Sequence, residues 1–127
     1  MAYEKARWAE YDGHLNTLIE EGILRASSSL TRLYEFLKSK NTRLIFVVSP
    51  GSSQMDYPDP HARALTVWEA WGQANDVPVL SLFALFFRHA PEYAELVQSS
   101  GHWNERGHAL VAEELIKQRK IFLPPAR

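Results

Sequence analysis

The sequence predicts a single α/β domain spanning residues 1–127, with helices on both faces of a small parallel sheet in a three-layer α/β/α arrangement. Two short apolar runs with strand character, a helical pattern between them and a longer one ahead of them lead to this prediction. The chain is 46% hydrophobic, enough for a domain of 127 residues to bury about two thirds of its unfolded surface in one core. No repeat, low-complexity segment or linker marks a second domain.

The first helix and the first strand follow each other directly. Apolar residues recur at helical spacing over residues 15–37, which predicts an amphipathic helix that bends or divides at residues 27–29, three serines. Residues 43–49 form a continuous β-branched and aromatic run, which predicts a strand buried on both faces. Pro50 ends that strand and opens a long loop.

A second helix and a second strand complete a βαβ unit. The helix is expected over residues 61–74, where Trp68 and Trp71 lie three positions apart, a spacing more typical of core packing than of a sugar-stacking platform. Residues 77–82 predict a short strand with Pro78 near its start, where a missing N–H is tolerated. Two strands joined by one helix predict a right-handed crossover with parallel strands.

The C-terminal third is predicted to be helical. Residues 83–93 are strongly apolar and aromatic, which predicts a short helix interrupted at Pro91. Asn104 is a suitable cap for the last helix. One face of that helix carries His108, Val111, Ala112 and Leu115.

Composition excludes several classes of function. The net charge is −1, with 14 basic and 15 acidic residues mixed along the chain, so no electrostatic footprint for nucleic acid is present. There is no cysteine, which excludes disulfides and thiolate chemistry. The first twenty residues are too charged for a signal peptide, and no apolar run approaches the length of a membrane span. We therefore expect a soluble protein with neither a nucleic-acid nor a membrane partner.

Residues 102–108, with the sequence His-Trp-Asn-Glu-Arg-Gly-His, are the most informative segment. A histidine placed just ahead of a helix can take the proton of a serine hydroxyl when a carboxylate holds its other ring nitrogen. This segment resembles the last catalytic block of the SGNH (GDSL-type) hydrolases, in which the general-base histidine occupies that place. The similarity extends in order over about 85 residues, counted from the first helix onward. It includes residues 30–37, 44–50, Gln54, Asp56, Trp68, Trp71, residues 80–86 and 102–108.

The resemblance implies the C-terminal half of a flavodoxin-like SGNH domain, acting in the hydrolysis or transfer of ester or O-acetyl groups without a cofactor. Carried over to this sequence, His102 is the general base. Trp103 and Asn104 are its packing and capping neighbours and candidate substrate contacts, and Gly107 is a close-contact position of the last helix.

Two parts of the family's machinery do not match. Ser100 stands where the family usually has the aspartate that orients the histidine, and a neutral partner in that role costs about four orders of magnitude in rate. No Gly-Asp-Ser nucleophile block precedes the first strand. Ser49, Ser52 and Ser53 follow the strand but lack the spacing of a nucleophile elbow and are expected in a loop. The chain alone is therefore expected to be inactive.

Two alternatives stay open. The chain is either a hydrolase-type domain or a noncatalytic interaction module that keeps the scaffold. A metal site built from its five histidines with Asp56 and Asp59 is less favoured, because no pair shows a recognised ligand spacing except His102 and His108, which are six apart and not on one helical face. Residues 12–16, with the sequence Asp-Gly-His-Leu-Asn, superficially resemble the later histidine block, but a turn at Asp12 and Gly13 that leads into the first helix explains them better.

The predicted strand at residues 43–49 has implications for partners. It would present an unpaired apolar edge where the family's earlier strands lie, and open apolar edges recruit other chains. The sequence therefore predicts either a homo-oligomer, most simply a two-fold dimer, or a missing N-terminal half.

Overall fold

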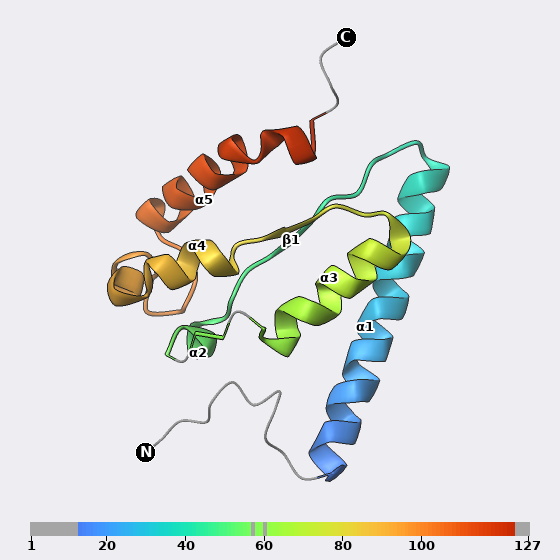
Figure 1. The fold of residues 1–127 in the computed structure, drawn as a ribbon, viewed down its shortest axis with the longest axis horizontal. Helices are drawn as coiled ribbons and strands as arrows, with labels where there is room; N and C mark the ends of the chain where they lie inside the picture. Colours follow the sequence, from blue (N-terminus) through green and yellow to red (C-terminus); the bar gives the residue numbers. More distant parts are fainter. Residues whose placement is uncertain (1–12, 57, 60, 124–127) are drawn as a thin grey trace.

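The structure, a computed structural model, describes residues 13–56, 58–59 and 61–123 (Figure 1). Its elements in chain order are α1 (Gly13–Ser39), β1 (Phe46–Val48), α2 (Ser52–Met55), α3 (Arg63–Asn75), β2 (Val79–Ser81), α4 (Phe83–Arg88), the 3-10 helix η1 (Ala90–Glu95), α5 (Glu105–Lys117) and the 3-10 helix η2 (Arg119–Ile121). The mixed helix and strand content confirms the α/β class.

The two strands form a parallel pair joined through α3. Phe46 is opposite Val79, Val47 opposite Leu80, and Val48 opposite Ser81. The predicted βαβ unit is therefore confirmed, although each strand contains only three residues. Two strands are too few to define a flavodoxin-like sheet, and that assignment stays a prediction.

Helix α3 covers one face of the sheet and links it to α1. The rings of Trp68 and Trp71 both meet Phe46 edge to face, with centroids 5.5 and 6.3 Å apart. Trp71 is only 8% exposed, and its indole N–H donates to the hydroxyl of Thr31 on α1 at 3.1 Å. Tyr34 adds a second contact from α1 to the Trp71 ring. The expectation that these tryptophans serve the core is confirmed for this pair.

Helices α4 and α5 cover the other face, but only over β2. Leu80 points to that face and is 1% exposed in a cluster with Phe86 and Val111. Val47 lies beside Leu80 on the same face, yet it is 43% exposed. The prediction that the first strand is buried on both faces is therefore wrong, because the C-terminal helices lie over β2 and leave β1 uncovered.

Two local predictions also need correction. Helix α1 continues without interruption through residues 27–29, because serine costs only about 0.5 kcal/mol per helical position and the turn that follows contacts Trp71 on α3 through Thr31 and Tyr34. The polar segment after Pro50 forms the one-turn helix α2 rather than a loop. Its first turn is closed by the Gln54 side chain, whose Oε1 accepts the Gly51 N–H at 2.8 Å.

The remaining elements follow the sequence closely. Helix α3 starts two residues later than expected, and the apolar segment after β2 divides into α4 and η1 with Pro91 in the first turn of η1. Asp12 lies outside the described residues, and Gly13 already belongs to α1. Within the described part of the chain, no helix combines the length and apolarity needed to cross a bilayer.

Two glycines provide a test of this packing. A Cβ on Gly72 would overlap the Val79 side chain and lie 2.8 Å from the Val77 carbonyl oxygen, whereas one on Gly22 would meet nothing within 4 Å. We expect Gly72→Ala to lower the free energy of unfolding by about 1–3 kcal/mol. Gly22→Ala, in the middle of α1, is expected to raise it by about 0.5–1 kcal/mol. Urea unfolding followed by circular dichroism measures both, and equal effects of the two variants would contradict the α3–β2 contact.

Candidate functional site

A groove of about 340 Å³ lies where the carboxyl end of β1 meets the start of α5. Parallel α/β sheets commonly bind ligands at the carboxyl ends of their strands. The residues around this groove come from the segment after β1 and from the much later segment that runs from η1 into α5: Ser49, Pro50, Gly51, Ser52, Tyr93, Gly101, His102, Trp103 and His108. We call it the His102 groove.

His102 is presented by a tight loop just before α5. The Gly101 N–H donates to the Gln98 carbonyl at 2.9 Å, and the Gln98 N–H donates to the His102 carbonyl at 2.7 Å. Gly101 has a φ of 80°, which glycine adopts without strain. The loop leaves the His102 side chain exposed at the groove, at the place the sequence indicates.

Asn104 fixes the junction between this loop and α5. Its Oδ1 accepts the Gly107 N–H at 3.0 Å, which confirms the predicted N-cap. Its Nδ2 donates to the carbonyl of Glu95 at 2.8 Å and contacts that of Val97 at 3.4 Å. Both the oxygen and the nitrogen of the Asn104 amide therefore bond to backbone groups, and Asn104 holds the His102 loop to η1. Its contact with substrate stays a prediction.

Trp103 anchors the same loop in the core. Its ring stacks on Phe86 with centroids 5.6 Å apart and meets His108 edge to face at 5.5 Å. A Cβ on Gly107 would overlap the Leu96 carbonyl and lie 3.0 Å from the Trp103 Cβ. The expected close-contact role of Gly107 is confirmed. The Trp103 ring is half-buried at the wall of the groove, and its contact with substrate stays a prediction.

The orienting partner of His102 is the weakest part of the site. Ser100 is exposed in the turn that precedes Gly101 and does not line the His102 groove. Among the described residues, the structure gives no ion pair to His102; the histidine that has one is His89, with Glu92 at 3.7 Å. Over the described ranges, no carboxylate holds the His102 ring.

The sequence analysis assigned Ser52 to a loop and did not name Tyr93, yet both line the His102 groove. The Ser52 hydroxyl lies 3.5 Å from the Tyr93 hydroxyl, and a Cβ on Gly101 would come within 3.1 Å of the Ser52 Oγ. Ser49 also lines the groove. The available signal was that Ser49 and Ser52 come just after a predicted parallel strand. Loops that follow parallel strands gather at one end of the sheet.

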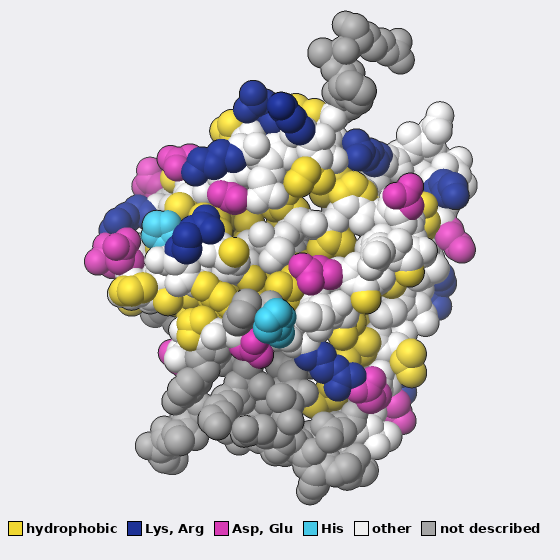
Figure 2. Space-filling view, in the orientation of Figure 1, with side chains coloured by type: hydrophobic (Ala, Val, Ile, Leu, Met, Phe, Trp, Pro, Cys, Tyr) yellow, Lys and Arg dark blue, Asp and Glu magenta, His cyan; other side chains and the backbone are white. Residues whose placement is uncertain are grey.

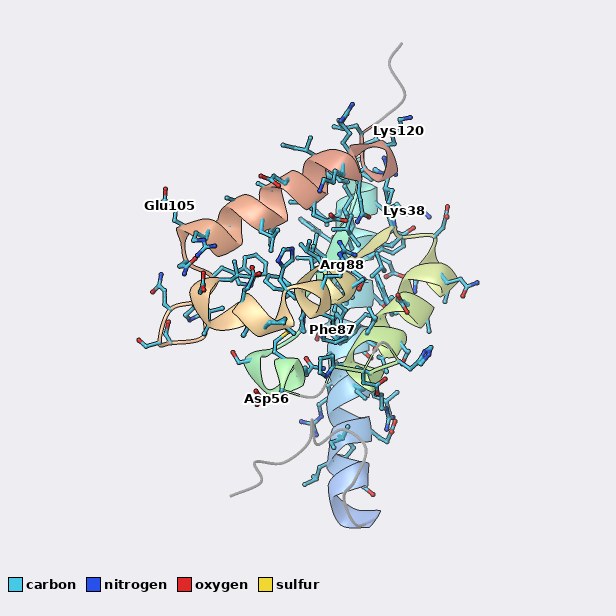
Figure 3. The ribbon with its side chains drawn as sticks, turned by 60° about the vertical axis from the view of Figure 1, so that its left-hand side comes forward. Lys38, Asp56, Phe87, Arg88, Glu105 and Lys120 are labelled. Atoms are coloured by element: carbon cyan, nitrogen blue, oxygen red, sulfur yellow. The ribbon has the colours of Figure 1, made fainter. Side chains whose placement is uncertain are left out.

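The His102 groove continues into a second hollow of about 480 Å³. The two share Ser52, Tyr93 and Gly101, and the second hollow adds Asp56 as its only carboxylate. Figure 3 shows Asp56, after α2, and Glu105, at the start of α5, on opposite sides of α4. Over residues 13–56, 58–59 and 61–123, no group of three or more His, Asp or Glu side chains is placed to hold a metal ion.

Comparison with known proteins assigns no class to this domain. No family model matches the chain, and neither a curated protein nor a solved structure matches it. The site that carries the argument is an exposed histidine in a groove at the carboxyl end of a parallel strand.

The two roles of the Asn104 side chain can be separated by mutation. Asn104→Ala removes both the cap and the amide donor, and we expect it to cost about 1–2 kcal/mol of unfolding free energy. Asn104→Ser keeps a cap oxygen but not the donor to Glu95, so its loss should be smaller. Thermal unfolding reports stability, and the His102 ring resonances in NMR spectra report the loop. An Asn104→Ala variant with unchanged His102 resonances would contradict the positioning role.

Proposed function

We propose that this chain is an SGNH-like hydrolase-type domain, with a flavodoxin-like architecture, which supplies the general base for hydrolysis or transfer of ester or O-acetyl groups. The observation that carries the proposal is the exposed His102 ring in a groove between the carboxyl end of β1 and the mouth of α5. A base in such a position reaches both a hydroxyl nucleophile and a bound ester. The histidine block at residues 102–108 supports the same assignment.

The nucleophile is assigned to a segment outside the described residues. Ser52 faces the Tyr93 hydroxyl, and no hydrogen bond joins it to an imidazole within the described chain. The amide of Asn104 is engaged by backbone groups. In this proposal His102 takes the proton from a serine hydroxyl supplied from elsewhere as that oxygen bonds to the ester carbonyl carbon. The tetrahedral intermediate then breaks its bond to the alcohol oxygen, and His102 returns the proton to the departing alcohol.

A noncatalytic interaction module is the rival function, and one observation favours it. Among the described residues β1 has a strand neighbour on one edge only, and this edge and the exposed Val47 side chain resemble a binding surface more than a finished enzyme scaffold. On the face in Figure 2, basic and acidic side chains are interspersed. The two functions differ in whether His102 matters for chemistry, which makes that residue the discriminating position.

The isolated chain should hydrolyse short-chain nitrophenyl esters no faster than background. A base without a nucleophile and without oxyanion donors gives little stabilisation of the transition state. A serine-directed phosphonate should accordingly leave the protein unlabelled in an intact-mass measurement. Stoichiometric labelling at Ser49, Ser52 or Ser53 would instead place the nucleophile within this chain and contradict the assignment.

The proposal itself is tested by the coding sequence upstream of Met1, where we expect an in-frame Gly-Asp-Ser segment. A protein that includes this segment should hydrolyse acetyl esters, and His102→Ala should lower kcat/KM at least about a thousandfold. His89→Ala is the matched control, because His89 lies outside the groove and pairs with Glu92. Activity that survives His102→Ala would refute the role of His102 and favour the interaction module.

A further inference from the structure

The second hollow, which continues from the His102 groove, has walls that the core holds in place. On one side is α2, whose Met55 is 6% exposed in the apolar cluster around Phe86. On the other side are η1 and the loop before α5, where Tyr93 meets the Phe86 ring edge to face with centroids 5.9 Å apart. An antiparallel bridge between Val97 and Trp103 closes that loop. Both walls are therefore preorganised, and the volume of about 480 Å³ lies within the range of about 300–1,000 Å³ for small-molecule sites.

Free hydrogen-bonding groups line the second hollow. Its two walls present side chains that have no hydrogen bond or ion pair within the described part of the chain: Ser53, Asp56, Gln98 and Ser99. Ser52 and Tyr93, which the hollow shares with the His102 groove, add two hydroxyls that lie 3.5 Å from each other. Hydroxyls and a carboxamide both donate and accept, whereas the carboxylate accepts. A ligand that fills the hollow therefore has to offer donors and acceptors on several sides.

Charged and apolar ligands fit this lining less well. Asp56 is the only charged side chain around the hollow, so an anion would meet a like charge and no counter-charge. An acyl chain would remove the same polar groups from water without replacing their hydrogen bonds, which is unfavourable for each group. A cation would find one carboxylate and one aromatic ring, that of Tyr93, whereas cation sites built on aromatic rings surround the charge with several.

A neutral sugar ring matches both the polar and the apolar part of the lining. Its hydroxyls donate and accept, as the free side chains of the two walls require. Its C–H faces need apolar atoms to pack on, and Pro91, Ala94 and Val97 supply them on the η1 side. Because the hollow and the His102 groove share Ser52 and Tyr93, one hydroxyl of a ring bound in the hollow can extend into the groove.

We propose that the second hollow binds one neutral sugar ring, whose hydroxyls pair with Asp56 at the end of α2 and with Gln98 on the opposite wall. The ring presents an esterified hydroxyl to His102 past the shared Ser52 and Tyr93. The presentation to His102 rests on the proposed function, whereas binding of the ring in the hollow does not.

The probes are methyl glycosides of glucose, galactose and mannose, each in a neutral form, as the uronide with a carboxylate in place of the primary alcohol, and with an ammonium group in that place. Cyclohexylmethyl acetate has a ring of similar size without hydroxyls. Each probe is titrated into the full chain, and the backbone amide resonances are followed by NMR. At least one neutral glycoside should bind saturably with a Kd of about 10 mM or lower and shift the amides of Ser53, Asp56, Gln98 and Ser99. The uronide of the same ring should bind at least about fivefold more weakly, because Asp56 repels it.

Variants separate the second hollow from nonspecific binding. Asp56→Ala and Gln98→Ala each remove hydrogen-bonding groups from one wall and should weaken binding of the neutral glycoside at least about fivefold. Both side chains are exposed, so both variants are expected to fold. Glu105→Ala is the control, because Glu105 is an exposed carboxylate that lines neither hollow and lies on the other side of α4 from Asp56 (Figure 3). It should change binding less than about twofold.

His102→Ala distinguishes a failure of this proposal from a failure of the proposed function. The neutral glycoside carries no ester and occupies the second hollow, so its Kd should change less than about twofold in this variant. Ester hydrolysis by the longer protein that survives His102→Ala, with glycoside binding intact, would contradict the proposed function alone.

Three outcomes would overturn the sugar site. The first is the absence of saturable binding by all of the neutral glycosides. The second is tighter binding of an ammonium glycoside that Asp56→Asn abolishes, which would identify a cation site. The third is tighter binding of cyclohexylmethyl acetate than of any neutral glycoside, with shifts of the same amides, which would identify a site for an acyl chain.

Discussion

The parallel pairing of β1 with β2 is the interaction on which the other layers depend. It places Phe46 and Val48 against α3, and Leu80 against Phe86 and Val111 on the opposite face. It also brings the carboxyl end of β1 beside the segment that follows η1. Each strand contributes only three residues, so most of the stabilisation must come from the side chains on the two faces rather than from the ladder.

The His102 loop shows how a short polar motif is held by the core. Trp103 is stacked against the apolar cluster, Asn104 connects α5 to η1, and Gly107 lets the helix approach the Leu96 carbonyl. Within the described part of the chain, the His102 ring has no side-chain hydrogen bond or ion pair. Trp103, Asn104 and Gly107 therefore fix the backbone position of His102, while its ring can reorient toward a ligand in the His102 groove.

Local patterns predicted the parts of the fold that local chemistry controls. Helical periodicity located α1 and α3, and a capping residue located the start of α5. Burial of β1 was misjudged because an apolar run looks the same whether one face or both are covered, and the coverage depends on where α5 lies. The one-turn helix α2 depends on the Gln54 side chain folding back on Gly51, which no periodicity shows.

The site was predictable only in part for a similar reason. His102 could be located from its own neighbours in the sequence, because its loop, its cap and its close-contact glycine lie within a few residues. Its proximity to Ser52 and Tyr93 depends on segments about 50 and 9 residues away, which meet only once the sheet and η1 are in place. Parallel strand order predicts that such loops gather, but not which hydroxyls face each other.

The shallow burial of α1 has a consequence for how the molecule opens. The contacts of this 27-residue helix to α3 include the Thr31–Trp71 hydrogen bond, the Tyr34–Trp71 ring contact and the Glu20–Arg63 ion pair, and none of its described side chains is fully buried. The free energy of a local opening follows the apolar surface that the opening exposes. Helix α1 should therefore detach as a separate cooperative unit well before the α3–β2–α5 core unfolds, so that the domain has two melting units of unequal stability.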